Sequence, residues 1–319
     1  MDRRTYVAAA LAALAGWVAA APAQPVPPRV KPVAVVNGVS ISMAELDAVV
    51  RAAGPEPVQL TAAQRRQQKV EALGLLIDNV LLRQFLERTT PPIAADVVER
   101  RLAELKIGLD AQRKSLKEFC RDTGQTEEQF EAAVADHLRW SAYVAGQLTD
   151  AAVEQYYKDN LDFFDQVKVT ASHVVFRVPQ AASEKDKEEA KAKLLALRKE
   201  LVEFPGDAEA RARKFAEVAK AKSQDARASQ GGDLGTFPRR WVFDEAFSKA
   251  AFALKEGEIS DVVETDFGYH LILVTKRDAG TKSDFVKIKE VVREFCAEDL
   301  RQAILAKERK AGKIEIDLP

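Results

Sequence analysis

Cysteine is scarce in this chain. The 319 residues include two cysteines, Cys120 and Cys296, and three histidines. Each thiol falls within an expected helix, and the sequence alone leaves open whether the two pair. No serine or cysteine nucleophile stands in a pattern that would pair it with a base, which disfavours a histidine-dependent hydrolase. No cofactor and no metal ion are expected for the chemistry considered below.

The chain also lacks an excess of charge of either sign. Forty-eight Lys and Arg residues face 49 Asp and Glu residues, which gives a formal net charge of −1. The charges are mixed along the expected helices, so nucleic acid is not an expected partner. The glycine-rich stretch Gly231–Gly235 lacks the Lys-Ser/Thr ending of a phosphate loop. With 47% hydrophobic residues, the chain can bury a core in each of two domains.

Long hydrophobic runs are absent except at the N-terminus. Arg3 and Arg4 precede the apolar stretch Val7–Ala20, and Ala21-Pro22-Ala23 follows as a small-residue cleavage site. This order predicts a signal peptide over residues 1–23 and a mature, exported chain that starts at Gln24. An uncleaved anchor is the alternative, but the stretch is short for a span of roughly 20 residues. No cysteine stands directly after it, so a lipid-modified N-terminus is not expected.

A proline-rich spacer is expected over residues 24–32. After it, the β-rich runs Val33–Val36 and Val39–Ile41 flank Asn37-Gly38, a pattern that predicts a hairpin. Ser42 should then cap a helix, with Glu45 completing a capping box.

The part of the chain up to residue 160 is expected to be mostly helical. Residues 61–88 carry apolar side chains at helical spacing over more than one face. Such a wide apolar face can be the core of a bundle or a groove for unfolded chains. Shorter amphipathic helices are expected at 93–107, 111–122, 126–147 and 149–160.

From Val167 onward the pattern changes to that of a compact α+β domain. The expected elements, in order, are a strand at 167–178, helices at 183–203 and 215–222, a glycine-rich turn, a helix at 241–254, and strands at 259–265 and 268–276.

The C-terminal part should return to the helical domain. A helix is expected at 283–311, and Ile314 and Ile316 are expected to add a strand beside Val33–Val36. The α+β domain would then be an insertion in a discontinuous helical domain. The expected limits are 1–23 signal peptide, 24–32 spacer, 33–165 helical domain, 166–278 α+β domain, and 282–319 the helix and strand that complete the helical domain.

Three pieces of the α+β domain carry chemical information together. They are Ala171-Ser172-His173-Val174-Val175-Phe176, Gln230-Gly231-Gly232-Asp233-Leu234-Gly235-Thr236-Phe237 and Phe267-Gly268-Tyr269-His270-Leu271-Ile272. In this order and at these separations they resemble the parvulin family of peptidyl-prolyl cis/trans isomerases. The resemblance covers the whole domain. It implies a small antiparallel sheet with surrounding helices.

The flanking helical segments resemble the chaperone parts of the SurA and PrsA foldases through shorter motifs. These are Val35-Val36-Asn37-Gly38, Leu76-Ile77-Asp78 and Lys313-Ile314-Glu315-Ile316. The resemblance implies a parvulin domain inserted in a mostly helical chaperone domain, with unfolded exported polypeptides as partners.

By the parvulin resemblance, Leu234, Phe243 and Phe247 would hold the proline ring of a substrate. Phe243 and Phe247 are four residues apart in the expected helix 241–254, so they should share a face. His173 and His270 would lie at the floor of the pocket, in the hydrogen-bond network around the substrate amide. The alternatives are ordinary core residues for the apolar set and a structural role, without titration, for the histidines.

Two further positions follow from the same resemblance. The family's Cys or Asp position falls on Asp225, counting back from Gly232 without a gap, and an acidic residue there could orient a histidine. Its alternative is a solvated loop aspartate. Phe267 would add an apolar wall. Arg177 stands alone where phosphate-selective relatives have a basic cluster, so phosphorylated substrates are not expected.

The resemblance implies isomerisation of X-Pro bonds without covalent chemistry. An apolar, water-excluding pocket would favour the twisted amide over the planar one. The alternative is a holdase chaperone whose parvulin domain binds peptides without catalysing their isomerisation.

Overall fold

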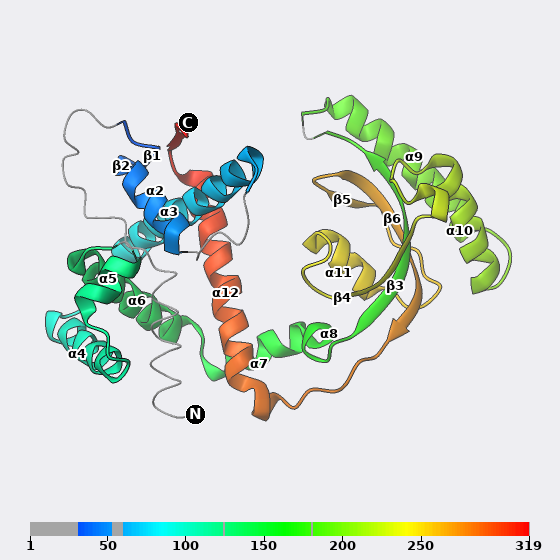
Figure 1. The fold of residues 1–319 in the computed structure, drawn as a ribbon. Coiled ribbons are helices and arrows are strands. Elements are labelled where there is room, and N and C mark those ends of the chain that lie inside the picture. Colours follow the sequence, from blue (N-terminus) through cyan, green and yellow to red (C-terminus); the bar gives the residue numbers. More distant parts are fainter. Residues whose placement is uncertain (1–30, 53–59, 124, 180, 319) are drawn as a thin grey trace. The chain divides into compact units, whose positions relative to one another are not determined.

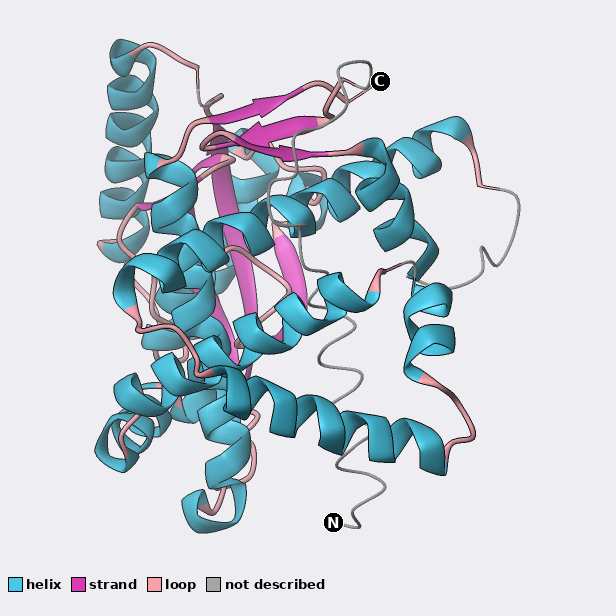
Figure 2. Ribbon diagram, turned by 90° about the vertical axis from the view of Figure 1, so that its left-hand side faces the viewer, coloured by secondary structure: helices cyan, strands magenta, loops and turns pink. Residues whose placement is uncertain are grey.

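The computed structural model describes residues 31–52, 60–123, 125–179 and 181–318. The expected signal peptide and most of the spacer lie outside these residues. Helices predominate, as Figure 2 shows, and together with two antiparallel sheets they confirm the α+β class. No helix in the described residues is long and apolar enough to cross a membrane.

The chain forms two compact units. The first contains the described residues up to Val153 and those from Arg293 onward, and the second contains Glu154–Val292. The second unit is therefore inserted in the sequence of the first. The boundaries of the α+β domain expected from the sequence, at 165/166 and at 278/282, stay a prediction.

The first unit begins with the predicted hairpin. Strands β1 (Ala34–Val36) and β2 (Val39–Ile41) pair antiparallel through a turn in which Asn37 and Gly38 both have positive φ, 49° and 88°. That turn geometry matches the right-handed twist of the strands. Strand β7 (Ile314–Ile316) pairs with β1, which confirms the strand expected at the C-terminus.

The helices of this unit follow the sequence pattern closely. Ser42 and Glu45 form the predicted capping box, with the Ser42 N–H donating to Glu45 Oε2 at 2.8 Å. Helix α3 packs its apolar residues against the hairpin, α2 and α12, and α4 to α6 share a second cluster. The helices are α2 (Met43–Ala52), α3 (Ala62–Thr89), α4 (Ala95–Ala111), α5 (Leu116–Thr123), α6 (Glu127–Gln147), α7 (Asp150–Asp159) and α12 (Phe285–Ala311).

The second unit is built on one four-stranded antiparallel sheet with the order β4-β3-β6-β5. Figure 1 shows the sheet curving around α11, with α9 and α10 on its outer face. Each face has its own apolar cluster. The strands are β3 (Lys168–Arg177), β4 (Asp233–Pro238), β5 (Val263–Thr265) and β6 (Gly268–Asp278), and the helices are α8 (Leu161–Phe164), α9 (Glu184–Val202), α10 (Ala208–Lys222) and α11 (Glu245–Ala253).

Several element limits predicted for this unit were wrong. Strand β4 replaces part of the expected glycine-rich turn, because pairing with β3 outweighs the low strand propensity of its residues. Helix α10 starts seven residues earlier than expected, at the cap of Asp207. The strand expected at 259–265 is reduced to β5, with Ile259 making an isolated bridge to Leu273.

Candidate functional site

The two histidines of the inserted unit meet on the inner face of the sheet. In the register of β3 and β6, His173 lies opposite Ile272 and His270 lies opposite Val175, so the two histidines are diagonal neighbours on one face. Their rings stack with centroids 5.5 Å apart, and the two Nδ1 atoms are 3.4 Å apart. Each side chain is buried, with 6% of each residue exposed.

Asp225 lies beside this pair, as its register in the sequence predicted. Its Oδ1 is 3.5 Å from His173 Nε2, and its Oδ2 is 3.6 Å from an Arg177 Nη atom. The Arg227 N–H donates to Asp225 Oδ1 at 2.9 Å. Burial raises the pKa of Asp225, but the Arg227 N–H, His173 and Arg177 together hold that pKa below its usual value. Asp225 is therefore an ionised acceptor at neutral pH.

Both histidines are neutral at pH 7. Burial lowers the pKa of His173, although Asp225 opposes this effect, and burial together with the neighbouring His173 lowers the pKa of His270 to about 4. A neutral imidazole has one donor and one acceptor nitrogen. The site therefore holds fixed dipoles and one carboxylate rather than a mobile positive charge.

The two neutral rings share a hydrogen bond between their Nδ1 atoms, one as donor and the other as acceptor. Ionised Asp225, 3.5 Å from His173 Nε2, favours the tautomer in which His173 carries its proton on Nε2 and His270 donates from Nδ1. The Nε2 atom of His270 then accepts from the Thr265 hydroxyl at 2.8 Å. The Thr265 oxygen in turn accepts from the N–H of Phe267 at 3.2 Å. The chain thus links β3, β5 and β6.

An aromatic cluster covers the histidines. Phe247 packs edge-on against His173 and His270, at centroid distances of 5.9 and 5.5 Å. Phe243 lies 5.0 Å from Phe247, and Leu234 packs against the same cluster. Phe247 is 3% exposed, whereas Phe243 and Leu234 are half-buried. Of the three apolar residues predicted for the proline pocket, Phe243 and Leu234 are therefore the ones with accessible surface, next to the buried ring of Phe247.

The prediction that Phe243 and Phe247 share one face of a helix was wrong. Helix α11 begins at Glu245 with Asp244 as its cap, so Phe243 precedes the helix instead of sharing a helical face with Phe247. Asp244 stops the helix there because its side chain accepts the N–H of Ala246. The rings meet because the loop before α11 turns back onto the sheet.

Gly232 determines how closely β4 approaches the histidine strand. A Cβ at this position would lie 2.1 Å from the carbonyl oxygen of His173, and its φ of 74° also favours glycine. The N–H of His173 donates to the carbonyl of Gly232 at 2.9 Å. Gly232 therefore positions the His173 backbone, whereas Gly231 lies against Ala216 of α10.

Sequence reasoning missed two members of this site, Phe237 and Thr265, and it placed Phe267 in the wall of the pocket. Phe237 is buried on β4 with its ring 4.6 Å from that of Phe243, and its place in the glycine-rich motif was the available signal. Thr265 was indicated only by its position at the end of an expected strand. Phe267 lies in the β5–β6 turn with 70% of its surface exposed and is not part of the packed aromatic cluster.

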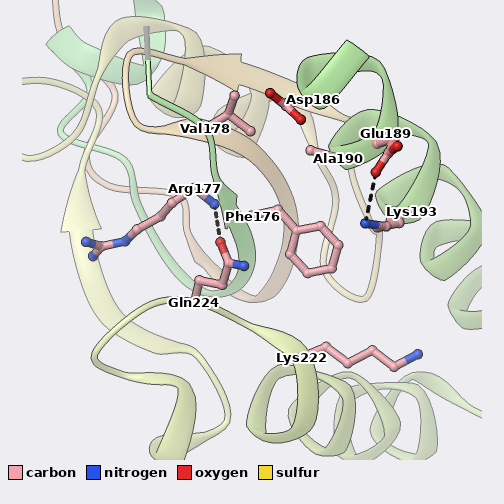
Figure 3. A pocket seen from close by; sticks show the side chains of 9 residues that line it. All are labelled: Phe176, Arg177, Val178, Asp186, Glu189, Ala190, Lys193, Lys222 and Gln224. Atoms are coloured by element: carbon pink, nitrogen blue, oxygen red, sulfur yellow. Dashed lines mark hydrogen bonds and ion pairs between the residues drawn. The ribbon is translucent and has the colours of Figure 1, made fainter. Parts of the chain in front are cut away.

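A separate pocket of about 440 Å³ lies by the apolar cluster on the α9/α10 face of the sheet. Figure 3 shows the Phe176 ring inside it and a Lys193–Glu189 ion pair at 3.6 Å along one side. The Gln224 side chain accepts the N–H of Arg177 at 2.7 Å. None of the seven site residues predicted from the sequence lines this pocket.

The described residues contain no group of three or more His, Cys, Asp or Glu side chains that could hold a metal ion. Cys120 and Cys296 are free thiols, which answers the question that the sequence left open.

Known proteins match the inserted unit and much of the whole chain. The family model described as PPIC-type PPIASE domain (Rotamase) matches residues 173–276. The foldase protein PrsA of Bacillus subtilis (strain 168) is 32% identical over 205 residues, which is 63% of this chain and 58% of that protein. PrsA of Clostridium botulinum (strain Loch Maree / Type A3) is 28% identical over 267 residues, 79% of this chain and 74% of that protein.

Among solved structures, the peptidylprolyl isomerase PrsA from Bacillus anthracis aligns with a TM-score of 0.38 and 22% identity. That alignment covers 74% of this chain and 96% of the other. The residues matched by the family model include both His173 and His270. The chain therefore carries a parvulin-type peptidyl-prolyl cis/trans isomerase domain of the PPIC type and is related to the PrsA foldases.

Proposed function

We propose that this protein isomerises X-Pro bonds in unfolded exported polypeptides, which it holds through its helical unit. The observation that carries the proposal is the hydrogen-bonded pair of neutral histidines, His173 and His270, which continues to Thr265, has Asp225 beside it, and packs against the aromatic cluster of Phe247 and Phe243. Export is supported by the signal pattern of residues 1–23.

The chemistry requires a twisted amide to be favoured over a planar one. Rotation about the X-Pro bond faces a barrier of about 18–20 kcal/mol because amide resonance is lost. The twisted amide has less charge separation, so a dry, uncharged pocket lowers its relative free energy. A reduction of ~5 kcal/mol would accelerate isomerisation between 10³- and 10⁴-fold. This mechanism needs no covalent intermediate.

Each site residue has a proposed role. Leu234, Phe243 and Phe247 hold the proline ring, and exposed Phe267 approaches the substrate from the β5–β6 turn. His173 and His270 present neutral dipoles at the floor, and Asp225 fixes the tautomer of His173. A protonated histidine would bring an unpaired charge under the twisted amide and weaken this effect.

A proline-limited refolding assay tests the proposal. The wild-type protein should accelerate refolding, and Phe243→Ala should lower kcat/KM by about 10- to 100-fold because a large part of the apolar contact is removed. Leu195→Ala is the matched control, since Leu195 is also partly exposed but lies on α9, across the sheet. Equal kcat/KM for wild type and Phe243→Ala would reject the pocket.

The alternative is a holdase in which the parvulin domain binds peptides without catalysis. The buried, neutral histidines are compatible with that reading because they also tie β3 to β6. The same assay separates the two. Suppressed aggregation without faster refolding by the wild-type protein would favour the holdase.

A further inference from the structure

The loop before α11 carries the most exposed aromatic residue of the inserted unit's apolar surface. Trp241 is 76% exposed and its neighbour Val242 is 53% exposed, although Phe243, the next residue, turns into the aromatic cluster. Solvent exposure of two large apolar side chains in succession is a feature of binding surfaces rather than of ordinary loops. Trp241 is also well suited to binding, because its large ring loses little conformational entropy.

The backbone at Trp241 is held in a conformation that tryptophan disfavours. Its φ is 72°, in the left-handed region where a bulky residue is an outlier. Strain of this kind persists only where neighbouring contacts impose it, and it is concentrated at functional sites. A glycine or asparagine would satisfy the same turn without strain. The turn therefore does not require tryptophan at position 241, and the indole side chain has another role.

Two arginines impose that conformation. Arg239 makes a bidentate pair with Glu245, at 2.9 and 2.6 Å, which fixes one side of the loop to the start of α11. Arg240 donates to the side chains of Tyr156 and Asn160, at 3.0 and 2.8 Å, and lies 4.8 Å from the ring centre of Phe163.

The indole of Trp241 itself rests against this support. It packs edge-on against Phe163 with centroids 5.1 Å apart. These contacts hold the loop rigidly from both sides, and the binding surface is therefore formed in advance. A surface ordered before binding costs less entropy when a flexible chain arrives.

We infer that Trp241 and Val242 form a second subsite, which takes an aromatic or large aliphatic side chain of the same polypeptide whose proline lies on Phe243. The inference rests on the proposed function, because it continues the pocket wall that Phe243 provides. Trp241 and Phe243 are two residues apart, so their Cα atoms lie within about 7 Å. An extended client rises about 3.3 Å per residue. With the reach of both side chains, the client residue would lie two to four positions from the proline.

Paired peptides test this subsite in the full chain. Both peptides carry the same X-Pro bond, and they differ in having phenylalanine or serine three residues from the proline. The wild-type protein should isomerise the phenylalanine peptide with a kcat/KM about 2- to 10-fold higher, as expected for one aromatic contact. Trp241→Ala should bring this ratio close to one, and Trp241→Phe should keep most of it.

Two control variants make the result decisive. Leu195→Ala should leave the ratio at the wild-type value, because Leu195 is an exposed apolar residue on α9. Trp241→Gly removes the backbone strain together with the side chain and should lose the ratio as Trp241→Ala does. The inference would be overturned if the wild-type protein had the same kcat/KM for both peptides, or if the preference for the phenylalanine peptide persisted in Trp241→Ala and Trp241→Gly. An effect of Trp241→Ala on self-association alone would overturn it as well.

Failure of the proposed function would be recognised separately. If the wild-type protein isomerises neither peptide, the isomerase proposal fails, and the subsite is judged from the Kd ratio of the two peptides in an NMR titration. A Kd ratio that depends on Trp241 supports the subsite in that case too. A ratio of one rejects it.

Discussion

At the scale of single residues, the site depends on histidines that stay neutral. The lowered pKa values of His173 and His270 follow from burial, and the hydrogen-bond chain places one proton between the two Nδ1 atoms. Adding a second proton there would put two donors face to face. Lowering the pH should therefore begin to destabilise this unit while most carboxylates are still ionised.

The pH dependence of stability has a definite sign. Folding lowers the pKa of His270 from 6.5 to about 4, so the unfolded chain binds a proton more readily than the folded one. The contribution of His270 to the free energy of unfolding is therefore complete above pH 6.5 and is lost as the pH falls toward 4. The free energy of unfolding should fall by about 1.4 kcal/mol per pH unit, or ~3 kcal/mol in total.

Hydrogen exchange of the β6 segment would measure this effect, because it reports the opening of this unit alone. His270→Gln should be less stable at pH 7 and should show a flatter curve between pH 6.5 and 4. A variant curve parallel to that of the wild type would contradict the assigned burial effect.

Phe247 contributes to the stability of the inserted unit as well as to the site. Because it is 3% exposed and contacts both histidines, Phe247→Ala should cost about 3–5 kcal/mol and disturb the site indirectly. Phe247→Leu keeps most of the volume and should cost less than about 1.5 kcal/mol. Urea unfolding of the three proteins gives these differences. Equal midpoints for wild type and Phe247→Ala would show that the ring is not part of the core.

At the scale of elements, the last strand closes the first unit. Strand β7 pairs with β1, and the Asn37 and Lys313 backbones are joined through the Asn37 N–H at 2.9 Å. The Asp317 N–H adds a bond to the carbonyl of Val33 at 2.9 Å. The hairpin thus depends on residues that lie at the other end of the sequence.

Removal of residues 313–319 should destabilise the hairpin and α3 by about 1–3 kcal/mol, since net contributions are roughly 1 kcal/mol per hydrogen bond. Strand β6 should keep its exchange protection, because its partners are β3 and β5. Hydrogen exchange measured by mass spectrometry distinguishes the two segments. Unchanged protection in β1 after truncation would show that β7 adds nothing to the unit.

At the scale of the whole molecule, holding and isomerising should be separable. The aromatic cluster and the hydrogen-bond chain both lie within Glu154–Val292, whereas the wide apolar faces of α3 to α6 belong to the first unit. Phe243→Ala should therefore lose isomerase activity while it suppresses the aggregation of an unfolded client as well as the wild type does. Light scattering measures this. Parallel loss of both activities in folded Phe243→Ala protein would contradict the division.

The sequence alone determined what local patterns encode. The Asn37-Gly38 turn, the capping box of Ser42 and Glu45, and the long apolar stripe of α3 each depend on neighbouring residues, so they could be predicted. The motif residues His173 and His270 could also be named in advance. Counting back from Gly232 without a gap named Asp225, and the structure places that residue beside His173.

The tertiary structure decided the rest, because long-range pairing overrides local preference. Strand β4 forms from residues of low strand propensity since β3 offers it hydrogen bonds. Phe243 reaches Phe247 from outside the helix, and Thr265 joins the histidines through the strand register, which no local spacing shows. The strained backbone of Trp241 depends on partners about 80 residues away in Tyr156 and Asn160. Only the folded chain brings these residues together.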